Sequence, residues 1–407
     1  MDMEKTALVG RRPLLKWAAA GIVLGIDSAL PAKSVAAVLK PSVSAVDWSR
    51  RVIESNLTRT PDPTKFGGWN YPQGLFLIAQ YLIYRRTHDP KLLAYIRGFV
   101  DNHVDASGTL DIPIEALDNV LGAHLLVILY EETREQKYKL AADKFRRRFD
   151  TYPRTTDGGF WHGNRPERAW QLWLDGNYMA VPFLLRYGRA FGDSDYACAE
   201  AIKQLVVYHA HLKSDHMGLL YHAWDESGKA PWADPVTHHS AFFWCRALGW
   251  YGMTLVDTLD VLPHNQPGRE QLIAILRELV VGIAHYQDPQ TGLWYQILDQ
   301  PKLAGNWLET SSSSMFVYIL DVAVKRGYIS RSYLRVARKG YNGVMGRLTL
   351  GSDGLTNLAG ICVGTNVGDL AWYLARPRQT NDFHGLGAFV LMNEEWTTSV
   401  SSLRFSS

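Results

Sequence analysis

The feature that most constrains the fold is a recurring pair of helical segments joined by a short turn. Residues 75–86 form a run of apolar and tyrosine residues, and a new segment restarts at Asp89-Pro90, where aspartate can cap a helix and proline fits its first turn. The same pattern continues along the chain at 117–132 with 133–149, 180–191 with 196–211, 241–262 with 269–286, and 311–325 with a segment after Ser330. Thr133-Arg134-Glu135-Gln136 is expected to form a capping box at the start of its helix. A first helix over 46–57 and a last one over 382–395 bring the expected number of helices to twelve.

A second repeating element lies between these pairs, a loop that starts with glycine and carries aromatic and polar residues at its tip. The clearest copies are Gly159-Phe160-Trp161-His162, Gly218-Leu219-Leu220-Tyr221-His222 and Gly292-Leu293-Trp294-Tyr295-Gln296, with weaker copies starting at Gly67 and Gly354. Spacings of roughly 50 to 75 residues fit one helical hairpin plus one loop, which is the repeat of a closed helical ring. The sequence therefore predicts an all-α fold, an (α/α)6 barrel of six helical hairpins, as a single domain over residues 40–400 with its loops gathered at one mouth.

The N-terminal 36 residues are typical of an export signal. Gly10-Arg11-Arg12-Pro13 precedes an apolar run over 17–24, and small residues follow up to Ala36. The run is well short of the roughly 20 residues that a membrane-spanning helix needs, so a twin-arginine signal over 1–36 is favoured over a membrane anchor. A periplasmic or secreted protein is expected. The formal net charge of +3 over 407 residues gives no sign of binding to nucleic acid or of stable insertion into a membrane.

Two carboxylates lie in apolar surroundings at the start of predicted inner helices. Asp175 lies within "QLWLDGNYMAVPF", and Asp118 follows Ala116 and Leu117 in "IEALDNVLGAHLL". Burying an ionised carboxylate is costly unless it is paired or neutralised, so Asp175 is either a helix cap or a functional group. If both side chains face one cavity, one of them would keep its proton to a higher pH and could act as a general acid.

The segment "HHSAFFWCRALGWYGM" adds Trp244, Arg246 and Trp250 to the candidate site. Arg246 and Trp250 are four residues apart and share one face of a helix. An arginine on an aromatic inner face needs an anion, either Glu309 or Asp382 in a buried salt bridge or the carboxylate of a substrate. Aromatic faces with polar groups between them suit sugar rings, although they could also simply plug the barrel.

No cofactor or metal is expected. His238 and His239 are adjacent and would point in different directions on a helix, and no zinc-protease motif accompanies them. The sequence also contains no phosphate-binding loop, dinucleotide fingerprint or Gly-x-Ser-x-Gly turn, which argues against the phosphate, nicotinamide and serine-hydrolase classes.

Nine segments together resemble glycoside hydrolase family 105, the unsaturated rhamnogalacturonyl hydrolases, and less closely the unsaturated glucuronyl hydrolases. In order they are WNYPQGL, LDN, DGGFWH, WLDGNYMAVPF, GLLYHAWDES, WCRALGWYGM, GLWYQILDQP, LETSSSSMF and RPRQTNDFHGLGAF, from about residue 69 to 390. The resemblance implies a hydrolase that removes a Δ4,5-unsaturated uronic acid from the non-reducing end of rhamnogalacturonan-derived oligosaccharides, by protonating C4 of the enol ether while water adds at C5.

The resemblance also implies roles for residues of this chain. Asp175 would be the proton donor and the base that activates water, with Asp118 as its partner. The substrate-contact positions would be Asn70, Tyr71, His162, His222, Trp244, Arg246 and Trp250.

One departure from the family pattern bears on the leaving sugar. Gly163 stands where the family usually has a lysine, and the loop before "WLDG" is about two residues longer than usual. The loop cation is therefore missing or replaced by Arg165 or Arg168, which leaves the identity of the leaving sugar open.

Two other functions remain open from the sequence. One is a uronate polysaccharide lyase or epimerase on the same fold, which would need a histidine or tyrosine base. The other is a non-catalytic periplasmic oligosaccharide-binding protein, which would keep the aromatic cup without requiring Asp175.

Overall fold

The computed structural model describes residues 46–397, and its helices follow the predicted pairs. All twelve predicted helices are present within that range, and a short helix, α12, is added near the C-terminus. Their bounds are α1 Trp48–Arg59, α2 Tyr71–Thr87, α3 Pro90–Asp101, α4 Ala123–Thr133, α5 Gln136–Arg148, α6 Gly176–Phe191, α7 Ser194–Leu212, α8 Cys245–Val261, α9 Arg269–His285, α10 Thr310–Lys325, α11 Leu334–Met345, α12 Leu370–Leu374 and α13 Phe383–Thr397. Three 3-10 turns accompany them, η1 Pro63–Lys65, η2 Leu117–Asn119 and η3 Arg331–Tyr333.

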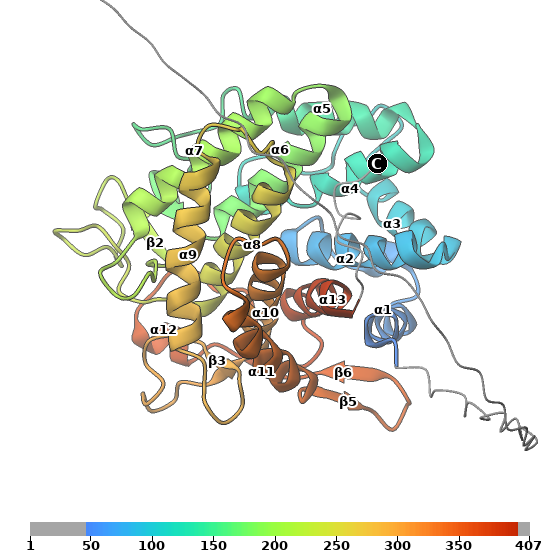
Figure 1. The fold of residues 1–407 in the computed structure, drawn as a ribbon. Coiled ribbons are helices and arrows are strands. Elements are labelled where there is room, and N and C mark those ends of the chain that lie inside the picture. The colour runs from blue at the N-terminus through green and yellow to red at the C-terminus, as the bar shows by residue number, and fades with distance from the viewer. Residues whose placement is uncertain (1–45, 398–407) are drawn as a thin grey trace, which may run out of the picture. The chain divides into compact units, whose positions relative to one another are not determined.

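Alternate helices form a closed inner ring (Figure 1). In order around the ring, α2, α4, α6, α8, α10 and α13 each pack against the next, and α13 packs back onto α2. Each inner helix also packs against an outer helix: α3, α5, α7, α9 and α11 pack on the inner helix that precedes them in the chain, and α1 packs on α13. This arrangement confirms the (α/α)6 barrel, with the sixth hairpin made from the first and last helices.

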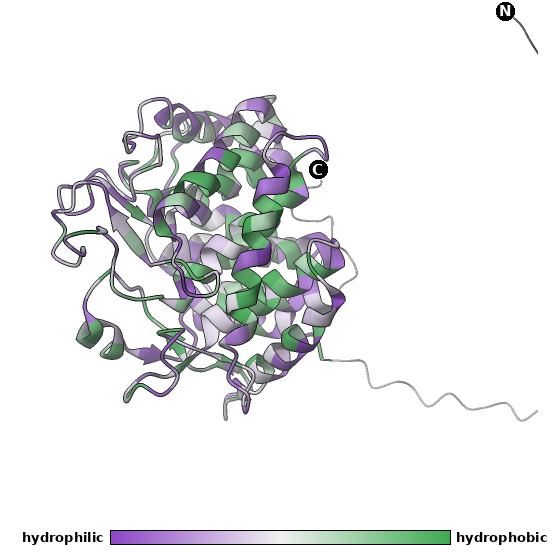
Figure 2. Cartoon of the chain, turned by 60° about the vertical axis from the view of Figure 1, so that its left-hand side comes forward, coloured by the Kyte–Doolittle hydropathy of each residue, from purple (hydrophilic) through white to green (hydrophobic). Residues whose placement is uncertain are grey.

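Burial separates the two rings. Every residue of α10 from Thr310 to Val324 is buried, whereas the outer helix α11 buries only Ala337, Gly340 and Val344. An inner helix is covered on all sides by its neighbours, so it reads as continuously apolar, while an outer helix needs only one apolar stripe. In Figure 2 the apolar residues are concentrated in the helices. The loops and short strands lie on the left side of that view.

Short antiparallel strands tie the connections between hairpins together. They pair as β1 Gln171–Trp173 with β2 Ala223–Asp225, β3 Trp294–Tyr295 with β4 Leu308–Glu309, β5 Leu348–Leu350 with β6 Thr356–Leu358, and β7 Ile361–Cys362 with β8 Arg378–Gln379. In the first pair Leu172 lies opposite Trp224. Because each connection leads from an outer helix into the next inner helix, the strands lie beside the N-terminal ends of the inner helices.

Two local predictions are wrong. The segment 117–132 is not one helix, because the Asn119 carbonyl accepts the indole N–H of Trp69 at 2.8 Å and α4 starts only at Ala123. The expected capping box at Thr133 does not form either. The Thr133 hydroxyl donates to the Leu129 carbonyl, and α5 starts after Glu135, which does not cap it with its side chain.

One compact unit begins at Asp47. The predicted export signal over residues 1–36 lies outside the described residues, as do the two ends of the predicted domain, 40–45 and 398–400. Within 46–397 none of the helices is both long and apolar enough to cross a membrane.

The loop glycines give a first prediction, which compares Gly218→Ala with Gly354→Ala. Both residues have positive φ, +78° and +74°, but a Cβ at Gly218 would lie 2.1 Å from the Glu278 carbonyl oxygen, whereas one at Gly354 would meet nothing within 4 Å. Left-handed strain alone should cost Gly354→Ala about 1 kcal/mol. The backbone clash should cost Gly218→Ala at least ~2 kcal/mol more. Denaturant unfolding measures both, and equal losses would contradict the packing account.

Candidate active site

The N-terminal ends of the inner helices meet at the mouth that holds the candidate residues. Since each helix N-terminus carries partial positive charge from its free N–H groups, a mouth surrounded by several of them favours an anionic ligand. The residues at these ends are Tyr71 of α2, Asp118 in the turn before α4, Asp175 before α6, Arg246 in the first turn of α8, Glu309 before α10 and His384 in the first turn of α13.

Asp175 does not cap its helix. It occupies the N-cap position of α6, but its side chain makes no capping hydrogen bond. The residue is only 9% exposed, and Oδ2 lies 3.3 Å from Nε2 of His222. This contact lacks hydrogen-bond alignment, and neither atom has another hydrogen-bond partner within the described residues. The carboxylate therefore projects into the mouth beside one imidazole and keeps an oxygen open to a ligand.

His222 is held from behind by α12. Its Nδ1 lies 2.5 Å from the hydroxyl of Tyr373, a residue of that short helix. Burial raises the pKa of the Tyr373 phenol and lowers the pKa of His222. A protonated phenol donating to Nδ1 of a neutral imidazole leaves the N–H of His222 on Nε2, where it faces Asp175.

Asp118 is held as an anion by an imidazole and a guanidinium of the same loop. Its oxygens lie 3.4 Å from Nε2 of His162 and 3.1 Å from Nη1 of Arg168. Burial opposes ionisation of Asp118, but His162 and Arg168 outweigh it and lower the pKa of Asp118 to about 2. Of the two expected carboxylates, Asp118 is therefore not the one that keeps its proton near neutral pH.

An aromatic ring joins the two carboxylates into one site. Trp173 stacks on His162 with ring centroids 4.4 Å apart and meets His222 at 5.9 Å. The residues next to the two acids also lie close together, since a Cβ added to Gly176 would lie 2.8 Å from the Leu117 side chain. Both Asp118 and Asp175 act electrostatically on Tyr71. The structure therefore brings the two predicted carboxylates to the same mouth.

The predicted tryptophans are buried directly behind side chains of this mouth. Trp244 lies 4.7 Å from the His222 ring, and Trp250 lies 4.9 Å from Tyr178 and 6.2 Å from Tyr71. The Nε1 atoms of both tryptophans are buried and have no hydrogen-bond partner within 46–397. Native interiors rarely leave buried donors unpaired, so their concentration here marks a site built for a polar ligand.

Arg246 has a different partner from the two considered from the sequence. Within the described residues it makes no ion pair with Glu309 or Asp382. Its guanidinium donates to the carbonyl oxygens of Cys362 and Val363, the latter at 2.7 Å. These bonds occupy both Nη atoms and leave buried Nε without a partner, so Arg246 fixes the loop after β7 while adding positive charge to the site.

Asn70 is the predicted site residue with the weakest connection to the others. Its side-chain oxygen accepts from the Tyr71 N–H at 2.8 Å and caps α2. Tyr71 itself reaches His384, with its hydroxyl 2.7 Å from Nε2. The structure thus gives Asn70 a capping contact and Tyr71 a place inside the mouth.

Several site residues were not identified as such from the sequence. Trp173 and His384 lie in segments that carry the family resemblance, but what places them in the site is their contact with His162 and with Tyr71, which are distant in the sequence. Tyr373 belongs to a five-residue helix too short to show a periodic pattern. Of the two arginines that could replace the loop cation, Arg168 contacts Asp118, at 3.1 Å.

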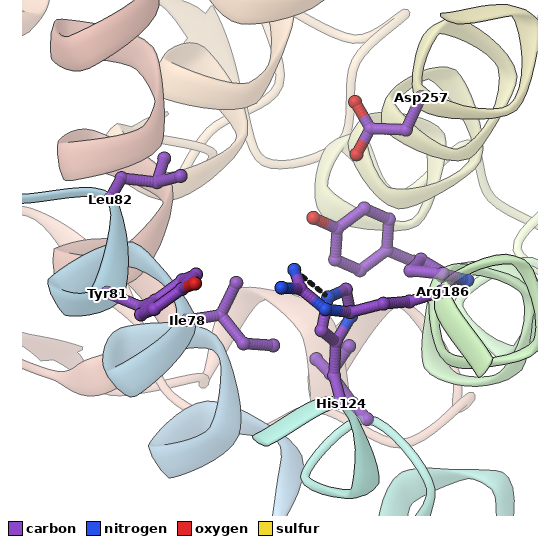
Figure 3. Close-up of a pocket in the computed structure, with 9 residues that line it drawn as sticks. Ile78, Tyr81, Leu82, His124, Arg186 and Asp257 are labelled. Carbon is purple, nitrogen blue, oxygen red and sulfur yellow. Dashed lines mark hydrogen bonds between the residues drawn. The ribbon is translucent and has the colours of Figure 1, made fainter. Parts of the chain in front are cut away.

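A small cavity continues below the mouth (Figure 3). It measures about 20 Å³, room for about one water molecule and far too little for a sugar ring. Arg186 contacts His124 at 3.3 Å in this cavity and pairs with Glu131. A ligand is therefore confined to the mouth. The cavity is lined by Ile78, Tyr81, Leu82, Leu121, His124, Tyr178, Pro182, Arg186 and Asp257.

The described residues also limit where a metal could bind. Within 46–397 no group of three or more histidine, cysteine, aspartate or glutamate side chains is arranged to hold a metal ion.

A pair of carboxylates at one mouth is the arrangement that glycoside hydrolases use for acid–base chemistry. The chain belongs to Glycosyl Hydrolase Family 88, whose model matches residues 48–399. The resemblance to family 105 is confirmed by a solved Clostridium acetobutylicum ATCC 824 glycoside hydrolase from that family, 35% identical, with a TM-score of 0.82 and coverage of 86% of this chain and 99% of that one.

Two further relatives are informative. The unsaturated rhamnogalacturonyl hydrolase YesR of Bacillus subtilis strain 168 is 27% identical over 253 residues, covering 60% of this chain and 68% of YesR. The unsaturated glucuronyl hydrolase of Bacillus sp. GL1 has a TM-score of 0.62 at 14% identity over 86% of this chain and 96% of that one, and shares the fold.

The pairing of Asp118 gives a prediction about acid stability. Because the pKa of Asp118 is lower in the folded chain than in the unfolded one, its ion pairs stabilise the fold at neutral pH, and this stabilisation is lost as pH falls from about 4 to about 2. The loss should be about 2 kcal/mol. The difference in unfolding free energy between wild type and Asp118→Asn should shrink by that amount over this range. Arg168→Gln should show a smaller acid loss than wild type, and a pH-independent difference would contradict the assignment.

Proposed function

We propose that the protein removes a Δ4,5-unsaturated uronic acid from the non-reducing end of rhamnogalacturonan-derived oligosaccharides by hydrating the enol ether. The observation that carries this proposal is the buried Asp175 carboxylate, which has an oxygen without a hydrogen-bond partner among the described residues and lies beside His222 at a ring of helix N-termini. The relationship to YesR supports the choice of sugar.

The two acids would have separate roles in this reaction. Asp175 delivers a proton to C4 of the double bond, and its carboxylate then accepts a proton from the water that adds at C5. The N–H on Nε2 of His222 can donate to this carboxylate once its proton has left. Asp118 stays ionised, so its charge stabilises the positive charge that develops on the ring at C5. The resulting hemiketal opens and releases the leaving sugar.

The charge of the mouth suits the carboxylate of the substrate. The inner-helix N-termini and the buried Arg246 guanidinium both favour an anion there. The buried rings of Trp250 and Trp244 pack against Tyr71 and His222 and so hold these two side chains in place beside the substrate. The small cavity below admits no second sugar, which supports attack on a terminal residue.

Arg168 is the cation that would face the leaving sugar. Its guanidinium lies 4.7 Å from the Trp173 ring, contacts Asp118, and donates to Asn366 at 3.1 Å. Arg165 is exposed and makes no side-chain contact in the described structure. These contacts support Arg168, rather than Arg165, as the proposed replacement for the loop lysine. We also propose that the protein acts in the periplasm or outside the cell after export through its N-terminal 36 residues.

The central test uses Asp175→Asn. The purified variant should bind a lyase-generated unsaturated disaccharide as wild type does, yet lose activity on the order of 10³-fold, because it cannot supply the proton. The ultraviolet absorption of the conjugated uronate reports turnover, and titration calorimetry reports binding. Loss of the band in wild type supports hydration, a gain would indicate a lyase, and binding without change would indicate a carbohydrate-binding protein. Normal turnover by the Asn variant would remove Asp175 from the mechanism.

A matched pair of variants tests the loop cation. Arg168→Gln should lower kcat/KM on the unsaturated disaccharide by ~10-fold or more, since it frees Asp118 and removes a contact at the leaving-sugar side. Arg165→Gln changes the same charge in the same loop and should leave kcat/KM unaffected. Equal effects of the two substitutions would show that only the net charge of the loop matters.

A further inference from the structure

Three side chains from the two ends of the compact unit form a hydrogen-bonded line into the mouth. The hydroxyl of Tyr71 lies 2.7 Å from Nε2 of His384, and Nδ1 of His384 lies 2.5 Å from Oδ1 of Asp382. The Tyr71 and His384 rings meet edge to face with centroids 5.1 Å apart. Tyr71 starts α2 and His384 lies in the first turn of α13, so the line exists only because α13 packs against α2.

The protons along this line can be assigned from its chemistry. An ionised carboxylate can only accept hydrogen bonds, so Asp382 accepts a hydrogen bond from the Nδ1–H of His384. Burial opposes ionisation of Asp382, but its contacts with His384 outweigh it and lower its pKa. Burial, with help from Arg246, lowers the pKa of His384, so its Nε2 carries no proton and accepts from the Tyr71 hydroxyl.

With the protons assigned in this way, the Tyr71 oxygen can still accept a hydrogen bond. Burial raises the pKa of its phenol, so Tyr71 keeps its proton, and that proton is directed at His384. The lone pairs of its oxygen then remain to accept a hydrogen bond from another group. Tyr71 is partly exposed and lies edge to face with Trp250, within the electrostatic reach of Asp118 and Asp175.

The surroundings make this arrangement rigid. The Asp382 oxygen that accepts from the imidazole also accepts the His384 backbone N–H at 3.0 Å, so the start of α13 fixes the carboxylate. A Cβ on Gly364 would lie 3.4 Å from Nε2 of His384, which shows that the backbone at 364 closes over the imidazole. Arg246 holds the carbonyl of Val363 at 2.7 Å and so fixes this covering segment.

We propose that Asp382 and His384 are positioning residues that orient the Tyr71 hydroxyl as a hydrogen-bond acceptor for a ring hydroxyl of the unsaturated uronic acid. This proposal rests on the proposed function and adds a requirement to it: the terminal sugar must carry a free hydroxyl where Tyr71 meets it. A sugar whose hydroxyl at that position is methylated or removed could not donate, and Tyr71 could not compensate by donating instead.

Kinetics on the unsaturated disaccharide test the line directly. Tyr71→Phe and His384→Phe should each lower kcat/KM by about 10- to 100-fold, since each removes the oriented acceptor. The double variant should be no worse than Tyr71→Phe alone, because His384 acts through Tyr71. A purely structural role of His384 would instead give effects that multiply. Circular dichroism and thermal unfolding of each variant exclude misfolding as the cause.

The pH dependence of kcat/KM gives a second test, with His384→Gln as a variant that keeps the polar contact to Tyr71. When His384 takes up a proton at acid pH, its Nε2–H donates to Tyr71 and turns the phenol toward the sugar as a donor. Wild-type kcat/KM should therefore fall as pH drops through the pKa of His384, which lies below the usual value of 6.5. His384→Gln can still accept from Tyr71 but cannot titrate, so this part of the acid limb should disappear. The other charged groups facing the line, Arg246, Glu309, Asp118 and Asp175, are the same in both proteins.

The outcomes separate the two proposals. A wild-type protein that does not consume the unsaturated disaccharide would overturn the proposed function. An active wild type whose His384→Phe variant keeps full kcat/KM, or whose His384→Gln variant keeps the whole acid limb, would overturn the positioning role and leave the proposed function standing. A lower kcat/KM in Tyr71→Phe and in His384→Phe, with no further decrease in the double variant, supports the positioning role.

Discussion

Closure of the inner ring by α13 against α2 is the constraint on which the site depends. It brings the end of the compact unit against its beginning, and it places Tyr71 and His384 within 2.7 Å of each other. It also completes a circle of helix N-termini around one mouth, where their partial positive charges add. An open row of the same hairpins would leave α2 and α13 with bare apolar faces and would separate these two side chains.

The two carboxylates at the mouth are chemically identical but have different surroundings. Asp118 is paired with His162 and Arg168 and remains ionised, whereas Asp175 has one imidazole at 3.3 Å and an oxygen without a hydrogen bond. When two acids of one site have different surroundings, one can transfer the proton while the other stays ionised and stabilises positive charge. Trp173 contacts the histidine partner of each acid, stacking on His162 and meeting His222 edge to face.

Much of this architecture could be predicted from the sequence because helical periodicity and loop glycines are local signals. The helix pairs, the ring and the two carboxylates follow from such signals or from the family resemblance. The features that the sequence did not predict depend on contacts between residues distant in the chain. The break before α4 is caused by the indole of Trp69, and the partners of Arg246 are backbone carbonyls at 362 and 363, which no side-chain pattern reveals. Arg168 could be selected over Arg165 only by its distance to Asp118.

The polar atoms left unpaired around the mouth have a thermodynamic consequence. Each buried donor or acceptor without a partner costs about 1–3 kcal/mol of folding free energy, and among the described residues Trp244, Trp250 and Arg246 each contribute one such atom. Asp175 Oδ2 faces His222 Nε2 at 3.3 Å without hydrogen-bond alignment, so a ligand that donates to Asp175 recovers part of this cost on binding. The inner helices can tolerate the cost because they are covered on all sides. Stability and ligand affinity are therefore set by the same atoms at this mouth.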